Sequence, residues 1–365
     1  MRILLLISDF NRGGAERTAA LLANAWSGAG HAVTLMPTFT GTLAQAYPLD
    51  PSVTYAPLAA RIGAGSGMLR KLAALRREIH RDRYDVVCSF LTNVNISALL
   101  AAWGSGVPVI VSERVFPPSY PLGAVTEFAR RATYPMARYI VMQTPEGLGW
   151  LERLGLARKG RVIPNPVQLP LPAGAPCLPP EDFIQPQRRL LVAVGRLETQ
   201  KRFDWLISAF ARLSAQFPDW DLAILGEGSQ GDALRAQVKK AGLGKRVQFP
   251  GAAGNLGSWY RRADAFALVS AFEGFPNVLA EALAHDLPSL AIDCPSGPRE
   301  LLQDDRIGTL LDRDTTLESL TMELSRFLAA DWPLRHDAGA QLRRKLEIEH
   351  VSRLWLDLFQ QALSS

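Results

Sequence analysis

Cysteine is scarce in this 365-residue chain. Cys88, Cys177 and Cys294 are the three cysteines, and none of their spacings matches a zinc ligand set or the framework of a disulfide-rich domain. So few thiols in a chain of this length are typical of a protein from a reducing compartment.

Long apolar runs are missing as well. No run approaches the roughly 18–20 apolar residues of a membrane-spanning helix. The opening MRILLLISDF is apolar, but Asp9 and Asn11 follow where a signal peptide would have a longer core and small cleavage residues. We therefore expect a soluble, cytoplasmic protein.

Acidic residues are under-represented in the first part of the chain. Residues 1–165 hold 18 Lys and Arg against 10 Asp and Glu, whereas the remainder holds 22 against 25. A basic first part predicts an anionic partner on that side, such as a phosphate, a phospholipid surface or a nucleic acid. No basic–aromatic platform or zinc finger accompanies the charge, which disfavours nucleic acid.

Apolar strands alternate with helical patterns along most of the chain, and a length of 365 residues favours two domains. Continuous apolar strands separated by helices predict parallel sheets covered on both faces, which is the doubly wound α/β class. The strands expected in the first half are residues 3–7, 33–36, 85–89, 107–112 and 139–142. Those expected in the second half are residues 190–194, 221–225, 247–249, 265–268 and 289–292.

A proline-rich stretch divides these halves. Eight prolines fall between Pro164 and Pro186, which favours a linker over residues 166–187. We predict a first Rossmann-like domain at 1–165 and a second at 188–345. A helix within 346–365 has apolar residues at helical spacing and must pack on another element, for which the first domain is one choice. Two such domains place a cleft at the carboxyl ends of the strands, where doubly wound sheets bind ligands.

The first candidate site is the turn SDFNRGGAER after the first strand. Gly13 and Gly14 allow the backbone to approach a ligand closely, and the helix that follows favours an anion at its amino end. The pair alone is also compatible with a tight turn that binds nothing.

The second candidate site follows the first strand of the second domain, in VGRLETQKRFDWL. Arg196 and Lys201 lie five residues apart there, so both cations can reach a diphosphate and neutralise a leaving group without a metal. The competing interpretation is a pair of solvated loop cations.

The third candidate is EGFPNVLAE, where two carboxylates flank Gly-Phe-Pro-Asn. Pro276 suits the first turn of a helix, so Glu273 is expected in the preceding loop and Glu281 nearly two turns into the helix. The amides of Gly274–Asn277 would form the positive end of that helix. A carboxylate can hold sugar hydroxyls by charge-assisted hydrogen bonds, but for Glu281 taken alone a solvated helix position is the favoured interpretation.

Taken together, GGAER (13–17), GR…K (195–201), EGFPNVLAE (273–281) and the PNPV hinge resemble the retaining glycosyltransferases of family 4, which have the GT-B fold. The likeness covers nearly the whole chain. It implies a transferase that moves a hexose or N-acetylhexosamine from a nucleotide-diphosphate sugar, expected to be a UDP-sugar. It also implies retention of configuration, with the leaving phosphate accepting the acceptor's proton, and neither a metal nor another cofactor.

The same resemblance implies roles for individual residues. Arg196 and Lys201 would bind the diphosphate as catalytic residues together with Glu273, which would contact the donor sugar, and Glu281 would hold the ribose. The other donor-binding residues would be Gly13, Gly14, Gly195, Gly274, Phe275, Pro276 and Asn277.

The sequence departs from the family on the acceptor side. Many members have a histidine after the fourth strand of the first domain, where this chain has VSERVFPP with Glu113 and Arg114. The Ser-Glu-Arg tripeptide resembles the branch that extends lipid-diphosphate-linked oligosaccharides. This implies a polyprenyl-diphosphate-linked glycan acceptor and a place in cell-surface polysaccharide or glycoconjugate biosynthesis.

A basic helix is expected over residues 67–81. Arg70, Arg77 and Arg81 share one face, and Leu69, Leu72, Leu75 and Ile79 gather on the other. The basic face is either a solvated surface or a contact with anionic lipid headgroups or a polyprenyl diphosphate. In the second case the protein would be peripheral on the cytoplasmic face of the inner membrane.

Three functions are compatible with these motifs. A glycosyltransferase is favoured, an epimerase or hydrolase of nucleotide sugars with the same architecture is the second, and a non-catalytic nucleotide-sugar-binding protein is the third.

Overall fold

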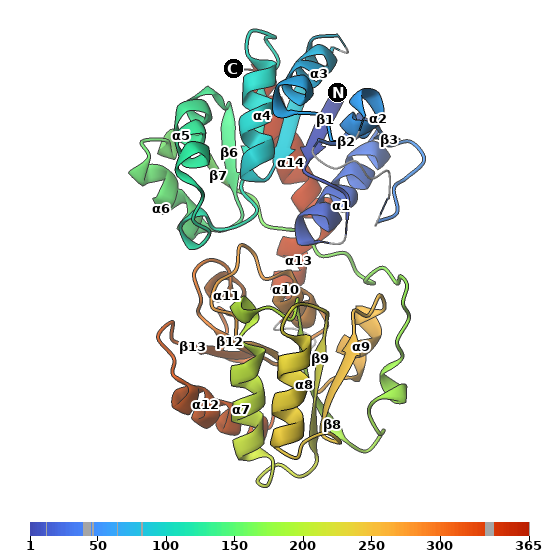
Figure 1. Cartoon of the computed structure of the whole chain (residues 1–365), viewed down its shortest axis with the longest axis vertical. Helices are drawn as coiled ribbons and strands as arrows, with labels where there is room; N and C mark the ends of the chain where they lie inside the picture. Colours follow the sequence, from blue (N-terminus) through green and yellow to red (C-terminus); the bar gives the residue numbers. More distant parts are fainter. Residues whose placement is uncertain are drawn as a thin grey trace. The chain divides into compact units, whose positions relative to one another are not determined.

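The computed structural model describes residues 1–11, 13–38, 45, 47–63, 65–81, 83–332 and 339–364. The chain divides into two compact units (Figure 1): Met1–Pro166 with Ile348–Ser365 form the first, and Val167–Glu347 form the second.

In the described residues, the first unit contains a seven-stranded parallel sheet in the order β3-β2-β1-β4-β5-β6-β7. Its strands are β1 (Arg2–Ile7), β2 (Ala32–Pro37), β3 (Thr54–Tyr55), β4 (Val86–Phe90), β5 (Val109–Ser112), β6 (Tyr139–Met142) and β7 (Gly160–Val162). Its helices are α1 (Gly14–Gly28), α2 (Leu58–Ile62), α3 (Met68–Arg81), α4 (Thr92–Ala102), α5 (Ala124–Thr133), α6 (Pro145–Arg153) and α14 (Ile348–Ser364).

The second unit has a six-stranded parallel sheet in the order β10-β9-β8-β11-β12-β13 over its described residues. The strands are β8 (Arg189–Val194), β9 (Trp220–Leu225), β10 (Val247–Gly251), β11 (Ala265–Leu268), β12 (Ser289–Ile292) and β13 (Gly308–Leu311). The helices are α7 (Phe203–Leu213), α8 (Gly231–Lys240), α9 (Leu256–Arg262), α10 (Asn277–Ala284), α11 (Pro298–Leu301), α12 (Leu317–Ala329) and α13 (Ala340–Leu346).

Each sheet is covered on both faces, as the continuous apolar strands predicted. Along β1, Leu5 belongs to one hydrophobic cluster, and its neighbours Leu4 and Leu6 belong to another. Successive side chains of a strand point to opposite faces, so the two clusters lie on the two sides of the sheet. The same alternation holds along β8 in the second unit.

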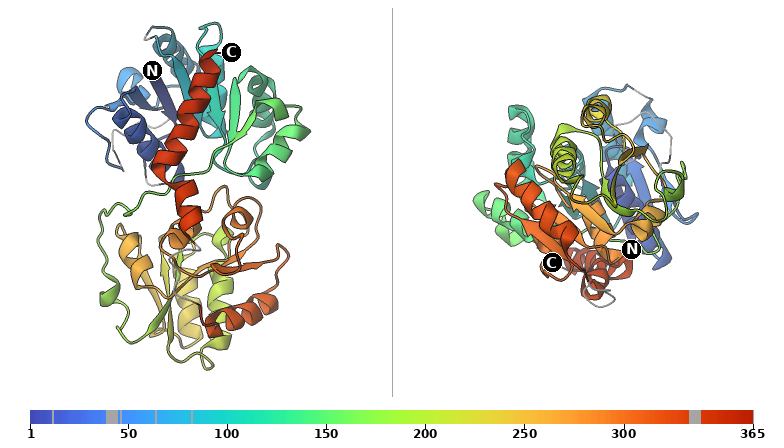
Figure 2. Two further views of the ribbon diagram at one scale, coloured as in Figure 1. Left: turned by 180° about the vertical axis from the view of Figure 1, so that it is seen from behind. Right: turned by 90° about the horizontal axis from the view of Figure 1, so that it is seen from below.

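The last helix, α14, packs in the first unit. Figure 2 shows it in red alongside the strands of that unit. Its Trp355 and Phe359 are fully buried and contact Trp26 of α1 edge-on, with ring centroids 6.1 and 5.0 Å apart. Burial of three large aromatic rings explains why this helix joins the first unit.

The proline-rich stretch is not the free linker that its composition favoured. Val167 and Ile184 are buried in the core of the second unit. The backbone N–H and C=O of Leu178 both bond to the side chain of Asn255, at 2.9 and 3.0 Å. Residues 167–187 are therefore a packed part of the second unit, whose start at Val167 replaces the predicted start at residue 188.

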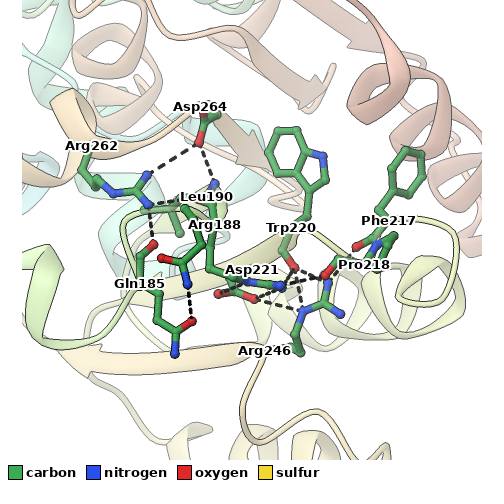
Figure 3. Close-up of polar contacts among 11 residues, drawn as sticks. Gln185, Arg188, Leu190, Phe217, Pro218, Trp220, Asp221, Arg246, Arg262 and Asp264 are labelled. Atoms are coloured by element: carbon green, nitrogen blue, oxygen red, sulfur yellow. Dashed lines mark hydrogen bonds and ion pairs between the residues drawn. The ribbon is translucent and has the colours of Figure 1, made fainter.

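Ion pairs stabilise the second sheet at the amino ends of its strands. Figure 3 shows Asp221 of β9 between the guanidinium groups of Arg188 and Arg246, with N–O distances of 2.6 and 2.9 Å. The two arginines also donate to the carbonyls of Pro218 and Phe217, both at 2.8 Å. This network satisfies a buried carboxylate and holds the strand at the edge opposite the candidate site.

None of the helices in the described residues is long and apolar enough to span a bilayer.

Candidate active site

The loop after β8 brings Lys201 back over Gly195. A Cβ atom at Gly195 would lie 3.0 Å from Cε of Lys201, so the absence of a side chain leaves room for the lysine stem. Lys201 ends a short 3-10 turn, Thr199–Lys201, directly before α7. A glycine is therefore needed at position 195 because a larger residue would collide with the Lys201 side chain at the end of the strand.

Lys201 and Glu273 form an ion pair in this structure. The Nζ–Oε1 distance is 2.6 Å, and both side chains are largely buried. Gln200 joins the two loops, because its carbonyl accepts from the N–H of Ala271 at 2.8 Å and its side chain donates to the carbonyl of Phe272 at 2.6 Å. Two of the predicted catalytic residues are thus adjacent and fixed by their backbones.

The loop Gly274–Pro276 precedes α10, which begins at Asn277, one residue after the proline. The N–H of Asn277 donates to the carbonyl of Phe275 at 2.9 Å, and Pro276 has no N–H. Among the described residues, no acceptor is paired with the N–H groups of Gly274 and Phe275. Of the three N–H groups in residues 274–277, those of Gly274 and Phe275 are therefore the ones left for a ligand.

A second loop supports the first one. The Ser296 hydroxyl donates to the carbonyl of Gly274 at 2.8 Å. Gly297 has φ +116°, and a Cβ atom there would lie 2.2 Å from Cδ of Pro276. Only glycine combines that backbone angle with so close an approach, so the contact between the two loops depends on it.

Glu281 is buried, with an exposed fraction of 2%. The hydroxyl of Tyr260 donates to its Oε2 at 3.2 Å. The alternative that Glu281 is a solvated helix position is therefore wrong. A buried carboxylate must be held by hydrogen bonds, and Tyr260 is a partner that the sequence pattern did not indicate.

Arg196 and Cys294 differ sharply in their surroundings. Arg196 is exposed, and within the described chain its guanidinium makes no hydrogen bond or ion pair. Cys294 is buried close to Glu273 and Lys201; burial, followed by the nearby charge of Glu273, raises the pKa of its thiol to about 12. The thiol is thus protonated at neutral pH and unsuited to act as a nucleophile.

In the first unit, the turn before α1 contains Gly13 and Gly14. The N–H of Gly13 donates to the hydroxyl of Tyr47 at 3.1 Å, and that hydroxyl donates to the carbonyl of Gly13 at 3.0 Å. The contact of the two glycines with a diphosphate stays a prediction.

Glu16 folds back over this turn. A Cβ atom at Gly13 would lie 2.1 Å from its Oε2. Burial, reinforced by Asp9, raises the pKa of the Glu16 carboxyl. The sequence analysis gave Glu16 no role. Its position as an acidic residue in the first turn of a helix was the feature that could have drawn attention to it.

Glu113 lies inside the first unit. It is 3% exposed and accepts hydrogen bonds from Thr92 Oγ1, at 2.8 Å to Oε2, and from the hydroxyl of Tyr134, with Arg130 4.0 Å away. Burial raises the pKa of its carboxyl, although the two hydroxyl donors oppose the shift.

Arg114 is also buried. Its guanidinium lies 3.5 Å from the ring centroid of Phe90 and donates to Asn165 Oδ1 at 2.7 Å. In the described structure its Nε and Nη2 atoms have no acceptor, and burial lowers its pKa to about 9. The acceptor-side roles expected for Glu113 and Arg114 stay predictions, and both side chains are packed within the first unit.

Helix α3 presents Arg70, Arg77 and Arg81 to solvent, as predicted. Leu75 and Ile79 are buried against the sheet. Leu69 was expected on that buried face but is 83% exposed, because the helix begins only at Met68 and its first turn projects beyond the packed part.

The structure thus brings Lys201 and Glu273 together with the Gly274 and Phe275 amides in the second unit, and Glu281 lies on the helix that follows. Gly13, Gly14, Glu113 and Arg114 belong to the first unit. Nowhere in the described residues do three or more His, Cys, Asp or Glu side chains gather in a way that could hold a metal ion.

Family models match both units of this chain. Residues 13–166 match the glycosyl transferase 4-like domain, and residues 179–345 match glycosyl transferases group 1. The chain belongs to the glycosyltransferases. The predicted family is therefore confirmed, and nothing in the comparisons favours an epimerase, a hydrolase or a binding protein.

Two curated relatives cover almost all of this glycosyltransferase. One is a Campylobacter jejuni alpha-1,4-N-acetyl-D-galactosaminyltransferase named for a diphospho-undecaprenol-linked glycan; it is 26% identical over 372 residues, or 98% of each chain. The other is the amylovoran biosynthesis glycosyltransferase AmsD of Erwinia amylovora, also 26% identical, over 98% of this chain and 99% of the relative.

Solved structures support the fold of this glycosyltransferase. Sucrose-phosphate synthase from Thermosynechococcus elongatus superposes with a TM-score of 0.80 at 18% identity and full coverage of both chains. Anabaena HepE in complex with UDP and glucose gives 0.78 at 17% identity, over 99% of this chain and 100% of that one. The GT-B fold predicted from the motifs is confirmed.

Proposed function

We propose that this glycosyltransferase moves a hexose or N-acetylhexosamine from a UDP-sugar to a polyprenyl-diphosphate-linked glycan, with retention of configuration. The observation that carries the proposal is the Lys201–Glu273 pair beside the unpaired amides of Gly274 and Phe275. Cations and amide donors suit a diphosphate, and a carboxylate suits sugar hydroxyls.

Lys201 and the exposed Arg196 bind the diphosphate. When the bond from the sugar C1 to the phosphate oxygen breaks, negative charge grows on that oxygen, and two nearby cations stabilise it. The ion pair with Glu273 holds the Lys201 ammonium in place before the donor arrives, so little reorganisation accompanies the reaction.

Glu273 and Glu281 hold the two ends of the donor. Glu273 accepts hydrogen bonds from hydroxyls of the transferred sugar, and the amides of Gly274 and Phe275 donate to sugar or phosphate oxygens. Glu281 accepts from ribose hydroxyls while Tyr260 fixes its other oxygen. HepE in complex with UDP and glucose, which shares the fold, supports uracil as the base.

Retention follows if the acceptor hydroxyl attacks from the face that the leaving phosphate vacates. The new C1–O bond then forms on the side of the broken one, and the acceptor's proton passes to the phosphate oxygen. The two cations do the work of charge neutralisation, so we expect no requirement for a metal ion.

The nature of the acceptor is inferred from relatives and from charge. Two Campylobacter jejuni relatives are named for undecaprenyl-diphosphate-linked glycans, and one of them is 33% identical over 62% of this chain. The exposed Arg70, Arg77 and Arg81 of α3 offer a cationic face for a lipid diphosphate or an anionic membrane. We place the protein peripherally on the cytoplasmic face of the inner membrane.

The activity is tested with a panel of nucleotide sugars, with and without a bacterial lipid extract. Release of UDP that depends on the extract supports transfer. Loss of the donor without an acceptor supports an epimerase or hydrolase, and binding without turnover supports a carrier. For the mechanism, we expect an α-linkage in the product from an α-linked donor, read from its anomeric proton signal, and unchanged rates in excess EDTA.

The membrane contact is tested by liposome sedimentation. Changing Arg70, Arg77 and Arg81 together to Glu should abolish binding to vesicles that contain anionic lipid. The matched control changes three exposed lysines of the second unit, Lys239, Lys240 and Lys245, to Glu. Both variants alter the net charge equally, so equal vesicle binding by the two would contradict a membrane contact through α3.

A further inference from the structure

A groove of about 920 Å³ lies at the amino edge of the first unit's sheet. It is bounded by the end of α4, the loop into β5, the end of α5 and the last turn of α14. The Gly13–Gly14 turn and Glu113 lie at the carboxyl ends of the strands, so the groove is at the other edge. Apolar side chains dominate its lining, among them Leu99, Leu100, Trp103, Val107, Met136 and Leu363.

The apolar side chains of this groove are unusually exposed. Trp103 is 71% exposed, Leu363 46%, Met136 41% and Leu100 39%. Isolated exposed apolar residues are ordinary on a protein surface, but several around one hollow mark a binding site. The volume also falls within the roughly 300–1,000 Å³ of small-molecule sites.

Two cations lie in the same groove. Lys159 donates to the carbonyl of Ala137 at 2.7 Å. The Nη2 atom of Arg138 is buried and has no acceptor among the described residues, and no described carboxylate forms an ion pair with either side chain. Burial, with the charge of Arg138, lowers the pKa of the Lys159 ammonium. Two neighbouring cations without a counterion favour an anion between them.

We propose that this groove binds a single anionic amphiphile, with its aliphatic chain along the apolar wall and its phosphate or carboxylate on Arg138 and Lys159. Most of the lining is apolar, and two cations beside an apolar wall match a lipid with one charged head. This site is distinct from the donor site, and the inference does not depend on the proposed transfer reaction.

The probe is decyl phosphate at concentrations below its micelle-forming range, titrated into the full-length protein by calorimetry. Decyl maltoside has the same chain without the charge, and inorganic phosphate has the charge without the chain. We expect saturable binding of decyl phosphate, with affinity at least about tenfold above that of either comparison compound, because both halves of the molecule have partners. Equal binding of decyl maltoside, or no binding of decyl phosphate, overturns the proposal.

Variants locate the site. The double change Arg138→Gln and Lys159→Gln should lower the affinity for decyl phosphate by at least about tenfold. Arg158→Gln, at an exposed cation next to Lys159, should leave this affinity unchanged. Ala132 is exposed and lines the groove, so Ala132→Trp should block the chain without entering the core. This second variant keeps the test valid if the double variant melts early by circular dichroism.

A membrane surface is the other source of the same chemistry. Vesicles containing phosphatidylglycerol are therefore tested alongside the monomeric probe. Binding of monomeric decyl phosphate that is lost in Ala132→Trp supports a site for one molecule. Binding of the vesicles alone, or decyl phosphate binding unchanged in both variants, overturns it.

Discussion

The turns after β1 and after β8 hold equivalent places in the two sheets, yet the charged side chains that they place there differ. In each sheet this strand pairs with the next one along the chain on one side and with the fourth strand of the unit on the other. The turn after β1 has Gly13 and a buried Glu16, and the turn after β8 has Gly195, Arg196 and Lys201. The same topological position therefore offers an acid in one unit and two cations in the other, which shows that the fold supplies the place and the side chains supply the chemistry.

The largest expected effect comes from the cationic turn. Lys201→Ala should lower kcat by about 10²- to 10³-fold, because a preorganised group that neutralises the leaving phosphate is lost. Steady-state release of UDP measures it. Lys240→Ala removes an exposed lysine of the same unit and should leave kcat unchanged. Near-normal turnover in the Lys201 variant would remove this residue from the mechanism.

Substitution of Glu281, on the helix after Glu273, should change the donor KM more than kcat. Glu281→Ala should raise the donor KM by about 10- to 100-fold and lower kcat less, because a carboxylate that holds ribose acts in the ground state and the transition state alike. Tyr260→Phe should give a smaller change of the same kind.

The exposed Glu318 of α12 provides the control for this series as Glu318→Ala. A loss confined to kcat in the Glu281 variant would contradict a ribose-holding role.

Arg114, a buried arginine of the first unit, should affect stability rather than donor binding. Arg114→Lys loses the stacking on Phe90 and the hydrogen bond to Asn165, since an ammonium lacks the planar fork. We expect a decrease of about 1–3 kcal/mol in the free energy of unfolding. Urea denaturation measures it, with Arg158→Lys as the exposed control. A weaker affinity for UDP without any loss of stability would instead assign Arg114 to the site.

The smallest effect is expected on thermal stability, from substitution of Glu16 after β1, and it depends on pH. The pKa of Glu16 is raised in the folded protein, so the folded state is favoured when this carboxyl is protonated. The resulting stability is complete only below the unfolded pKa of about 4.3. That stability is lost as the pH rises through the folded pKa. Glu16→Gln avoids this loss, so its Tm should exceed the wild-type Tm at pH 7, and the difference should shrink at pH 4. A Tm difference independent of pH would contradict the buried carboxylate.

The sequence predicted ten of the thirteen strands in the described residues, their parallel pairing and the family, because these depend on local apolar runs and on motifs at strand ends. It missed β3, β7 and β13. It also separated Glu273 from Glu281 correctly, since a proline before a helix is a local signal. The burial of Glu281 depends on Tyr260, which comes from another helix, and no spacing within EGFPNVLAE indicates it.

The predictions that failed share this dependence on distant partners. Composition favoured a free linker, but Val167 and Ile184 enter a core built from later strands. The helical wheel placed Leu69 on the sheet side, although this side chain in the first turn of α3 is 83% exposed. The acceptor-side role of Arg114 stays a prediction, but its hydrogen bond to Asn165, far along the chain, is a contact that a tripeptide motif does not reveal.

The return of α14 to the first unit has a consequence for how the protein is made on the ribosome. Trp26 lies in a core that is closed by Trp355 and Phe359, so the first unit waits for the last helix before its hydrophobic face is covered. All of Val167–Glu347 is translated in between. At about 5–20 residues per second this interval is on the order of ten to forty seconds. During that time the nascent chain carries an open aromatic surface, and we expect this surface to recruit chaperones.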